Sequence, residues 1–219
     1  MKQKLNFFFC LVTIIVMSIV LYSCQSDDDP RLIIDPVEPY VTLSADGVPS
    51  FLNPTRMTRE LFNENIVGRG WYYESSHEIK PDGTIMMTDF YQDMIGISPS
   101  HYYFDADSLT VFRYHDSQGY VNGGLGFVRY AYTYNEADQG IYVQGRRVLQ
   151  LNPVGEKGYK YLRTVRWSAM RSDGTQVYTL DIFRRMTDKE LEKIRQTYSA
   201  NFTVNEDKQN LSYFSTFPF

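Results

Sequence analysis

The sequence predicts an all-β protein, in which a single antiparallel meander of about eight strands closes into a barrel between a short helix and a C-terminal helix. The 219 residues include 18 Tyr and 14 Phe, which favour the half-buried surface of a sheet. From Gly70 to Arg185 apolar and polar residues alternate in short runs. Turn signals at Pro81-Asp82-Gly83, Asn152 to Gly158 and Ser172-Asp173-Gly174 separate these runs, as in a meander of short strands.

Two helices are expected at the ends of the meander. Residues 53–64 predict the first, with Asn53 as N-cap and Pro54 at the first helical position. The second begins after Thr187, an N-cap whose capping box is completed by Glu190 three residues later. Its apolar face consists of Leu191, Ile194 and Tyr198.

The first 23 residues indicate export. Lys2 and Lys4 precede an apolar run from Phe7 to Leu21, which is typical of a secretory signal peptide and too short for a membrane span. Residues 24–52 are acidic and rich in proline, which predicts an extended tether. Residues 53–219 then form one domain, the barrel with its C-terminal helix and tail.

Composition excludes several functions. Cys10 lies inside the predicted signal peptide and Cys24 directly after it, so the folded domain has no thiol for catalysis, for zinc or for a disulfide. The net charge is -4 and basic residues form no dense tract, which argues against a nucleic-acid partner.

The turn at Asp82-Gly83 sets a register for the first hairpin. It places Ile79 opposite Met86 and His77 opposite Thr88, with Trp71 and Tyr73 on the inner face. The same face then carries four polar residues that are candidate ligand-binding groups: Ser75, His77, Thr88 and Gln92. Polar groups inside a barrel need partners. They either line a ligand cavity or satisfy one another in a filled barrel.

The turn at Asp173-Gly174 sets the second register. Trp167 is expected opposite Leu180, and Arg163 opposite Arg184 on the inner face, which makes Arg163 a fifth candidate ligand-binding residue. On the other face, Arg166 is expected to meet Asp181 as an exposed cross-strand pair.

Metal and catalytic chemistry find no support. A two-residue turn at Ala106-Asp107 places His101 opposite Phe112, which puts His101 and His115 on opposite faces, so they cannot share a metal. No nucleophile, base and orienting group can be brought together. We expect no enzyme, no cofactor and no metal.

The N-terminal pattern, the opening Val67-Gly68-Arg69-Gly70-Trp71, the meander and the capped helix together resemble the lipocalin-like lipoproteins of Bacteroidetes-type bacteria. The resemblance implies that an arginine at the end of the last strand, Arg184, packs on Trp71 as a structural cap. Leu21-Tyr22-Ser23-Cys24 resembles a lipobox, which implies that Cys24 is lipidated. The acids at 27–29 resemble a surface-export signal.

The expected function is therefore that of a lipid-anchored envelope protein whose barrel holds a small hydrophobic or amphipathic ligand. The expected location is the outer membrane, on the cell surface or the periplasmic face. The alternative is a structural or interaction module with a filled barrel that docks another envelope protein.

Replacing Cys24 tests the anchor. If the lipid on Cys24 holds the protein, Cys24→Ala shifts it from the membrane fraction to the soluble fraction of lysed cells, measured by immunoblot after ultracentrifugation. Cys10→Ala is the matched control and leaves the distribution unchanged. Membrane retention of Cys24→Ala with unaltered mobility would contradict lipidation at this residue.

Overall fold

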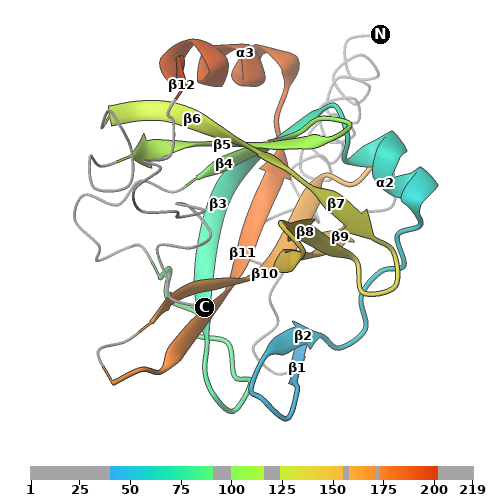
Figure 1. The fold of residues 1–219 in the computed structure, drawn as a ribbon, viewed down its shortest axis with the longest axis vertical. Coiled ribbons are helices and arrows are strands. Elements are labelled where there is room, and N and C mark those ends of the chain that lie inside the picture. The colour runs from blue at the N-terminus through green and yellow to red at the C-terminus, as the bar shows by residue number, and fades with distance from the viewer. Residues whose placement is uncertain (1–39, 91–99, 116–123, 155–157, 171–172, 202–219) are drawn as a thin grey trace, which may run out of the picture. The chain divides into compact units, whose positions relative to one another are not determined.

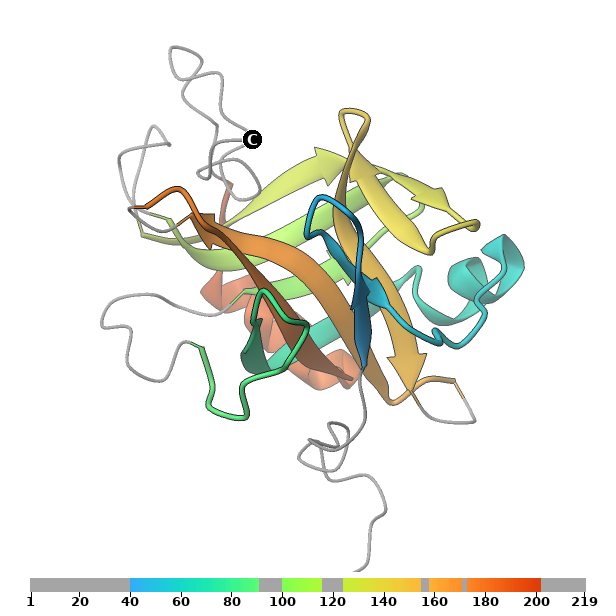
Figure 2. The same ribbon diagram turned by 90° about the horizontal axis from the view of Figure 1, so that it is seen from below.

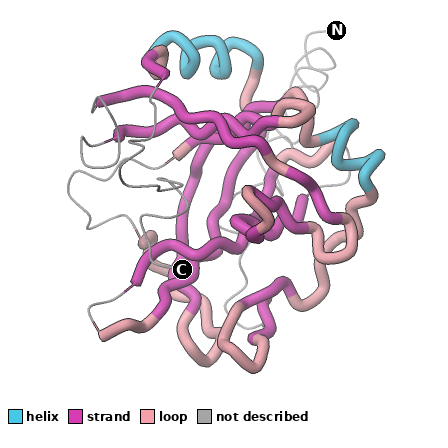
Figure 3. Tube along the Cα trace, viewed as in Figure 1, coloured by secondary structure: helices cyan, strands magenta, loops and turns pink. Residues whose placement is uncertain are grey.

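In the computed structural model, residues 40–90, 100–115, 124–154, 158–170 and 173–201 are described. These residues form strands and two helices (Figures 1 and 3), which confirms the all-β prediction. The elements are β1 (Val41–Leu43), β2 (Pro49–Phe51), α2 (Arg59–Asn65), β3 (Arg69–Ile79), β4 (His101–Phe104), β5 (Ser108–His115), β6 (Gly124–Ala131), β7 (Thr133–Asn135), β8 (Gly140–Val143), β9 (Arg146–Val154), β10 (Tyr161–Met170), β11 (Gln176–Arg185), α3 (Asp188–Thr197) and β12 (Ala200–Asn201).

One sheet curls round to make the barrel. Its order is β12-β6-β5-β4-β3-β11-β10-β9-β8-β7, so the first long strand, β3, pairs with the last, β11. β6 and β7 stand at opposite ends of this order, although only Tyr132 separates them in the chain. The sheet therefore closes through this one segment. Counted as a single strand, β6–β7 gives eight strands in an antiparallel meander, as expected.

Aromatic side chains fill one end of the barrel interior. Trp71, Tyr102, Phe104 and Phe183 are buried in the main apolar cluster. The Phe62 ring of α2 joins them, stacked on Tyr134 with ring centroids 4.1 Å apart. Phe→Ala substitution of such a side chain costs roughly 3–5 kcal/mol, so α2 is a stabilising plug for this end.

The helix α2 is shorter than predicted and starts later. Its N-cap is Thr58, whose hydroxyl accepts from the N–H of Leu61, in place of Asn53. Residues 52–57 instead form no helix, and buried side-chain amides hold this segment in place. The N–H of Phe51 donates to the Gln150 side chain at 2.9 Å. The N–H of Thr55 donates to the Asn152 side chain at 3.0 Å, and the N–H of Met57 to the Gln139 side chain at 2.8 Å.

A hairpin of β1 and β2 covers the outer face of the barrel, where the blue strands cross the orange ones in Figure 2. Val41 and Phe51 are buried in it. The guanidinium of Arg163 on β10 lies 5.2 Å from the ring centroid of Tyr40 and 6.0 Å from that of Phe51. The predicted tether, residues 24–52, thus ends earlier than expected, because its last part folds against the sheet. Residues 24–39 lie outside the described residues.

The C-terminal helix α3 has the predicted capping box. The Thr187 hydroxyl accepts from the N–H of Glu190, and the Glu190 carboxylate accepts from the N–H of Thr187. The same carboxylate binds the Arg184 guanidinium at 2.7 and 3.0 Å. Helix α3 lies over β6, β5 and β4 on the outer face (Figure 1). The tail beyond Asn201 lies outside the described residues.

Among the described residues, no helix is long and apolar enough to cross a membrane. The expected signal peptide lies outside these residues.

His101 links α3 to the barrel wall. Its ring stacks on Tyr72 at 4.3 Å, meets the edge of Tyr198 at 6.0 Å and accepts the Tyr73 N–H at Nδ1. Burial, and next the nearby positive charge of Arg184, lower the pKa of His101 to about 4. The native ring therefore stays neutral where the unfolded ring takes up a proton.

This shift predicts acid sensitivity. Stability is fully present above pH 6.5 and is lost as pH falls toward 4, because the unfolded chain binds the extra proton. Between pH 7 and pH 5 the free energy of unfolding should drop by about 2 kcal/mol more in the wild type than in His101→Gln, which cannot titrate. Urea unfolding at both pH values measures this difference. Equal drops in the two proteins would contradict a neutral, buried His101.

Candidate functional site

A bulge in β3 reverses the predicted faces of its polar residues. Tyr73 pairs with Phe183, but Ser75 pairs with Ile182, so Glu74 is an extra residue against β11. One extra residue turns every following side chain to the other face. Ser75 and His77 therefore face outward, and the prediction that they line the interior is wrong. The His77 ring makes hydrogen-bond contacts with Ser75 Oγ (2.9 Å) and the Met86 carbonyl (3.0 Å).

The other predicted ligand-binding residues do not come together in the interior either. Thr88 is exposed in an irregular segment, since the only bridge beyond the turn in the described residues joins Ile79 to Ile85. Arg163 faces outward under the hairpin and pairs with Ile182, not with Arg184. Gln92 lies outside the described residues.

The expected cap of Arg184 on Trp71 is replaced by another contact. Arg184 is the register partner of Tyr72 and lies over its ring at 4.5 Å. Its guanidinium also binds Glu74 at 2.6 Å, beside the pair with Glu190. Trp71 pairs in register with Arg185, one residue further. Neighbours on a strand face opposite sides of the sheet. The Arg184 side chain therefore lies on the outer face, next to α3, whereas Trp71 is buried in the interior.

A polar cluster lies inside the barrel beyond the aromatic end. Leu162 of β10 and Leu151 of β9 belong to the interior apolar cluster, and Leu151 pairs with Thr164. Alternation along β10 therefore carries Thr164 and then Arg166 inward. Together with their neighbours on β3 and β11, the buried interior polar residues are Ser76, Thr164, Arg166, Thr179 and Asp181.

An ion pair organises this cluster. Arg166 Nε lies 2.5 Å from Asp181 Oδ2, and the Ser76 hydroxyl donates to Asp181 Oδ1 at 2.5 Å. The side chains of Arg166 and Asp181 are only 4% and 1% exposed. The pair was expected on the solvent face. The apolar face of β10 and β11, with Val165 and Ile182, instead lies outward under the β1–β2 hairpin, which leaves Arg166 and Asp181 on the inner face. Around it, the buried hydroxyls of Thr164 and Thr179 find no hydrogen-bond partner within the described part of the chain.

A cavity opens beside Arg166, where β9 and β10 part. The two strands pair from Tyr161–Val154 to Val165–Gln150. Residues 146–149 of β9 and 166–170 of β10 continue beyond the last of these pairs. A cavity of about 350 Å³ fills this gap. Its walls include Val165, Arg166 and Trp167 in succession. The cavity therefore lies along the edge of β10 from which β9 has parted.

The cavity has mostly apolar walls with a few polar groups. Its apolar lining is Val48, Pro49, Val148, Leu149, Val165 and Trp167, and its polar lining is Arg147, Arg166, Gln176 and Tyr178. Burial raises the pKa of Tyr178, and the charge of Arg147 partly offsets this rise. The neutral phenol donates to Gln176 Oε1 at 2.7 Å. Such walls fit a small molecule with an apolar body and a hydrogen-bond-accepting head.

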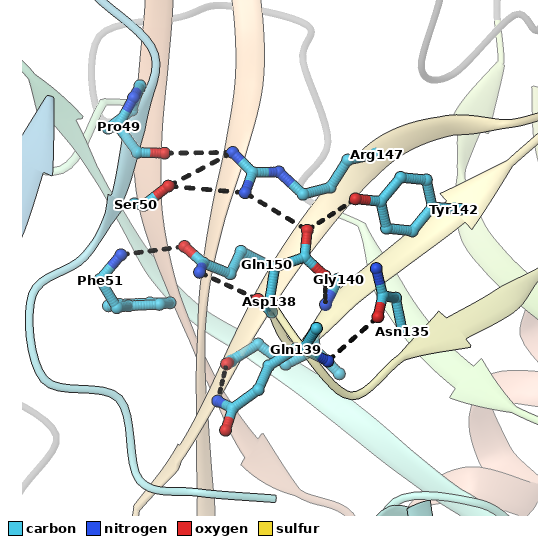
Figure 4. A network of polar contacts seen from close by, with 12 residues as sticks. Pro49, Ser50, Phe51, Asn135, Asp138, Gln139, Gly140, Tyr142, Arg147 and Gln150 are labelled. Atoms are coloured by element: carbon cyan, nitrogen blue, oxygen red, sulfur yellow. Dashed lines mark hydrogen bonds and ion pairs between the residues drawn. The ribbon is translucent and has the colours of Figure 1, made fainter. Parts of the chain in front are cut away.

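Arg147 holds the hairpin over this cavity (Figure 4). Its guanidinium reaches the Pro49 carbonyl at 3.4 Å and the Ser50 hydroxyl at 3.5 Å, and lies 3.7 Å from Asp138. These contacts are long for a guanidinium. Asp138 is better satisfied, since it accepts from the Tyr142 hydroxyl at 2.6 Å and from the Gly140 N–H at 3.0 Å. Arg147 therefore has hydrogen-bonding capacity for another acceptor.

A metal centre finds no support among the described residues, which contain no group of three His, Cys, Asp or Glu able to hold an ion. His101 does lie opposite Phe112, as predicted. The side chain of His115 lies outside the described part.

The sequence matches no protein-family model and no curated protein. One solved structure, of the lipocalin-type protein siderocalin Ex-FABP, aligns at 11% identity and a TM-score of 0.32, over 71% of this chain and 95% of that one. Its title states that Ex-FABP functions through dual ligand specificities. The fold assignment rests on the strand order and register described above.

Sequence reasoning missed these residues because it placed the apolar face of β10 and β11 inside the barrel, whereas the β1–β2 hairpin covers that face from outside. In the second hairpin Trp167 pairs with Tyr178, not Leu180, and a second irregularity follows between Trp167 and Ala169. A two-residue turn at Asp173-Gly174 was assumed, and it gives no sign of this shift.

Removing one partner of the interior ion pair should be costly. Asp181→Asn leaves the Arg166 charge buried without its counter-ion, and we expect the free energy of unfolding to fall by about 3–5 kcal/mol. Arg56→Gln, which breaks the exposed pair with Glu136, is the control and should cost less than about 1 kcal/mol. Denaturant melts measure both. A cost for Asp181→Asn no larger than the control's would place this carboxylate in solvent.

Proposed function

We propose that this barrel is a binding protein for a small amphipathic ligand, which enters the cavity between β9 and β10. The observation that carries the proposal is that cavity of about 350 Å³, whose lining includes six apolar residues and two arginines. Small-molecule sites have volumes of about 300–1,000 Å³ and a few polar groups that fix the orientation of the ligand.

The apolar body of the ligand is assigned to the part of the cavity between Leu149 and Trp167. Leu149 belongs to the interior apolar cluster and is 1% exposed, and Trp167 offers the largest apolar surface of the lining. An alkyl chain or ring seated between them gains roughly 25 cal/mol for each Å² of apolar surface removed from water.

The head group is assigned to Arg147 and not to Arg166. Arg166 already has a short, buried contact with Asp181, and breaking it would leave two buried charges apart. Arg147 is about a quarter exposed and lies 3.7 Å from its acid. A carboxylate can therefore bind its guanidinium in a bidentate manner while Asp138 keeps Tyr142 and Gly140.

The place of the protein follows from its first residues. The signal-peptide pattern and the lipobox support export and a lipid anchor at Cys24, as an outer-membrane lipoprotein of the bacterial envelope. Binding, and not catalysis, is the activity proposed for the domain. The ligand then reaches the barrel outside the cytoplasm.

Docking of another envelope protein is the alternative that the sequence raised. The large apolar side chains exposed in the described ranges are Leu52, Met87 and Leu125, which belong to three separate segments. Single exposed apolar residues are ordinary on protein surfaces, so no described patch favours docking over ligand binding.

Binding of decanoate, followed by calorimetry, tests the proposal. We expect the wild type to bind decanoate, Trp167→Ala to weaken it about tenfold through lost apolar contact, and Arg147→Gln to weaken it about tenfold through the lost charge. Decanol, which has no charge, should bind the wild type and Arg147→Gln alike. That comparison separates loss of the head-group contact from detachment of the hairpin.

Arg146→Gln is the matched control, because it removes the same charge from the neighbouring exposed residue, outside the cavity lining. It should bind decanoate as the wild type does. The proposal fails if the wild type binds neither probe, or if Trp167→Ala and Arg147→Gln bind decanoate as tightly as the wild type.

A further inference from the structure

A second pocket lies on the outer face of the barrel, next to α3. It has a volume of about 320 Å³ and is lined by residues of β4, β5, β6 and the end of α3. Three aromatic rings, Tyr103, Phe112 and Phe127, form its apolar walls, and two arginines, Arg129 and Arg195, complete it. It shares no lining residue with the cavity between β9 and β10.

Both arginines lie over aromatic rings. The Arg129 guanidinium carbon is 5.3 Å from the Phe127 ring centroid, and that of Arg195 is 4.6 Å from the Tyr103 centroid. Stacking of this kind orients a guanidinium and leaves its N–H edge available for planar, bidentate contacts. The pocket thus presents two oriented cations beside three rings.

Neither cation forms an ion pair with an acid of the described ranges. Among the described residues no carboxylate lies within 4.0 Å of Arg129 or Arg195, whereas Arg184, on the same outer face, binds two. Asp105 also lines the pocket and accepts from the N–H of Ala106 at Oδ1, but it forms no ion pair with either arginine. The pocket lining therefore carries two cations and one anion, in a chain that has more acids than bases overall.

The helix dipole accounts for only one of the two. Arg195 lies in the last turn of α3, where a cation is favoured. Arg129 belongs to β6 and not to a helix, and it lines the same pocket from the strand side. Their convergence is explained by an anion that both bind.

We infer that this pocket is a second ligand site, which takes a small aromatic carboxylate. The ring of the ligand packs against Phe112 and its neighbours, and its carboxylate is bound by Arg129 and Arg195. Thr110 and Ser199 at the pocket wall add hydroxyl groups for the remaining oxygen lone pairs.

Calorimetric titration with 2-naphthoate and with neutral 2-naphthamide tests this inference. The wild type should bind 2-naphthoate at least tenfold more tightly than the amide. Arg195→Gln and Arg129→Gln should each lose about tenfold in affinity for the carboxylate. Lys193→Gln, which removes the same charge from the same helix outside the pocket lining, should bind as the wild type does.

Arg147→Gln separates this site from the proposed one, since it should leave 2-naphthoate binding unchanged. The inference is overturned if the wild type does not bind 2-naphthoate, if the double variant Arg129→Gln/Arg195→Gln binds it as the wild type does, or if Arg147→Gln abolishes the binding.

Discussion

The extra residue at Glu74 is the constraint on which the rest of this barrel depends. Before it, β3 presents Trp71 and Tyr73 to the interior, where they pack with Phe183 and Tyr102. After it, the same strand presents Ser76 inward and turns Ser75 and His77 outward. A single bulge thereby divides the interior into an aromatic end and a polar end.

The two ends have different physical consequences. The aromatic end is covered by α2 and stabilised by apolar burial. At the polar end, the charge of Asp181 is neutralised by Arg166 and supported by the Ser76 hydroxyl. A buried charge pair is favourable only when its geometry is good and its remaining polar atoms are hydrogen-bonded. Here β10 supplies Arg166, β11 supplies Asp181, and β3 supplies the hydroxyl of Ser76. Beside it β9 leaves β10, and the cavity opens at that point.

The outer face is also divided. The β1–β2 hairpin covers β9 and β10, held by Gln150 and Arg147, and α3 covers β4 to β6. Each cover has a cavity at its margin, one by Trp167 and one by Arg195. Both cavities carry arginine beside aromatic rings, which is why both proposals concern ligands with an apolar body and an anionic head.

Local signals were read correctly from the sequence and long-range ones were not. The capping box of Thr187 and the pairing of His101 with Phe112 depend on residues close in the chain, and both are confirmed. The start of α2 at Thr58 depends on distant amides such as Gln139, which hold the preceding residues in place. The bulge at Glu74 depends on the partner strand β11, more than 100 residues away. For that reason the strands could be predicted, but the inner faces of their polar halves could not.

Double-mutant cycles between β3 and β11 test the central claim most directly. With Ser76→Ala, Asp181→Asn and the double variant, unfolding free energies should give a coupling of about 1 kcal/mol or more, because the hydroxyl donates to a buried carboxylate. The parallel cycle with Ser75→Ala should give a coupling near zero, since Ser75 faces outward. Strong coupling to Ser75 and none to Ser76 would mean that β3 has no bulge, and it would contradict this account.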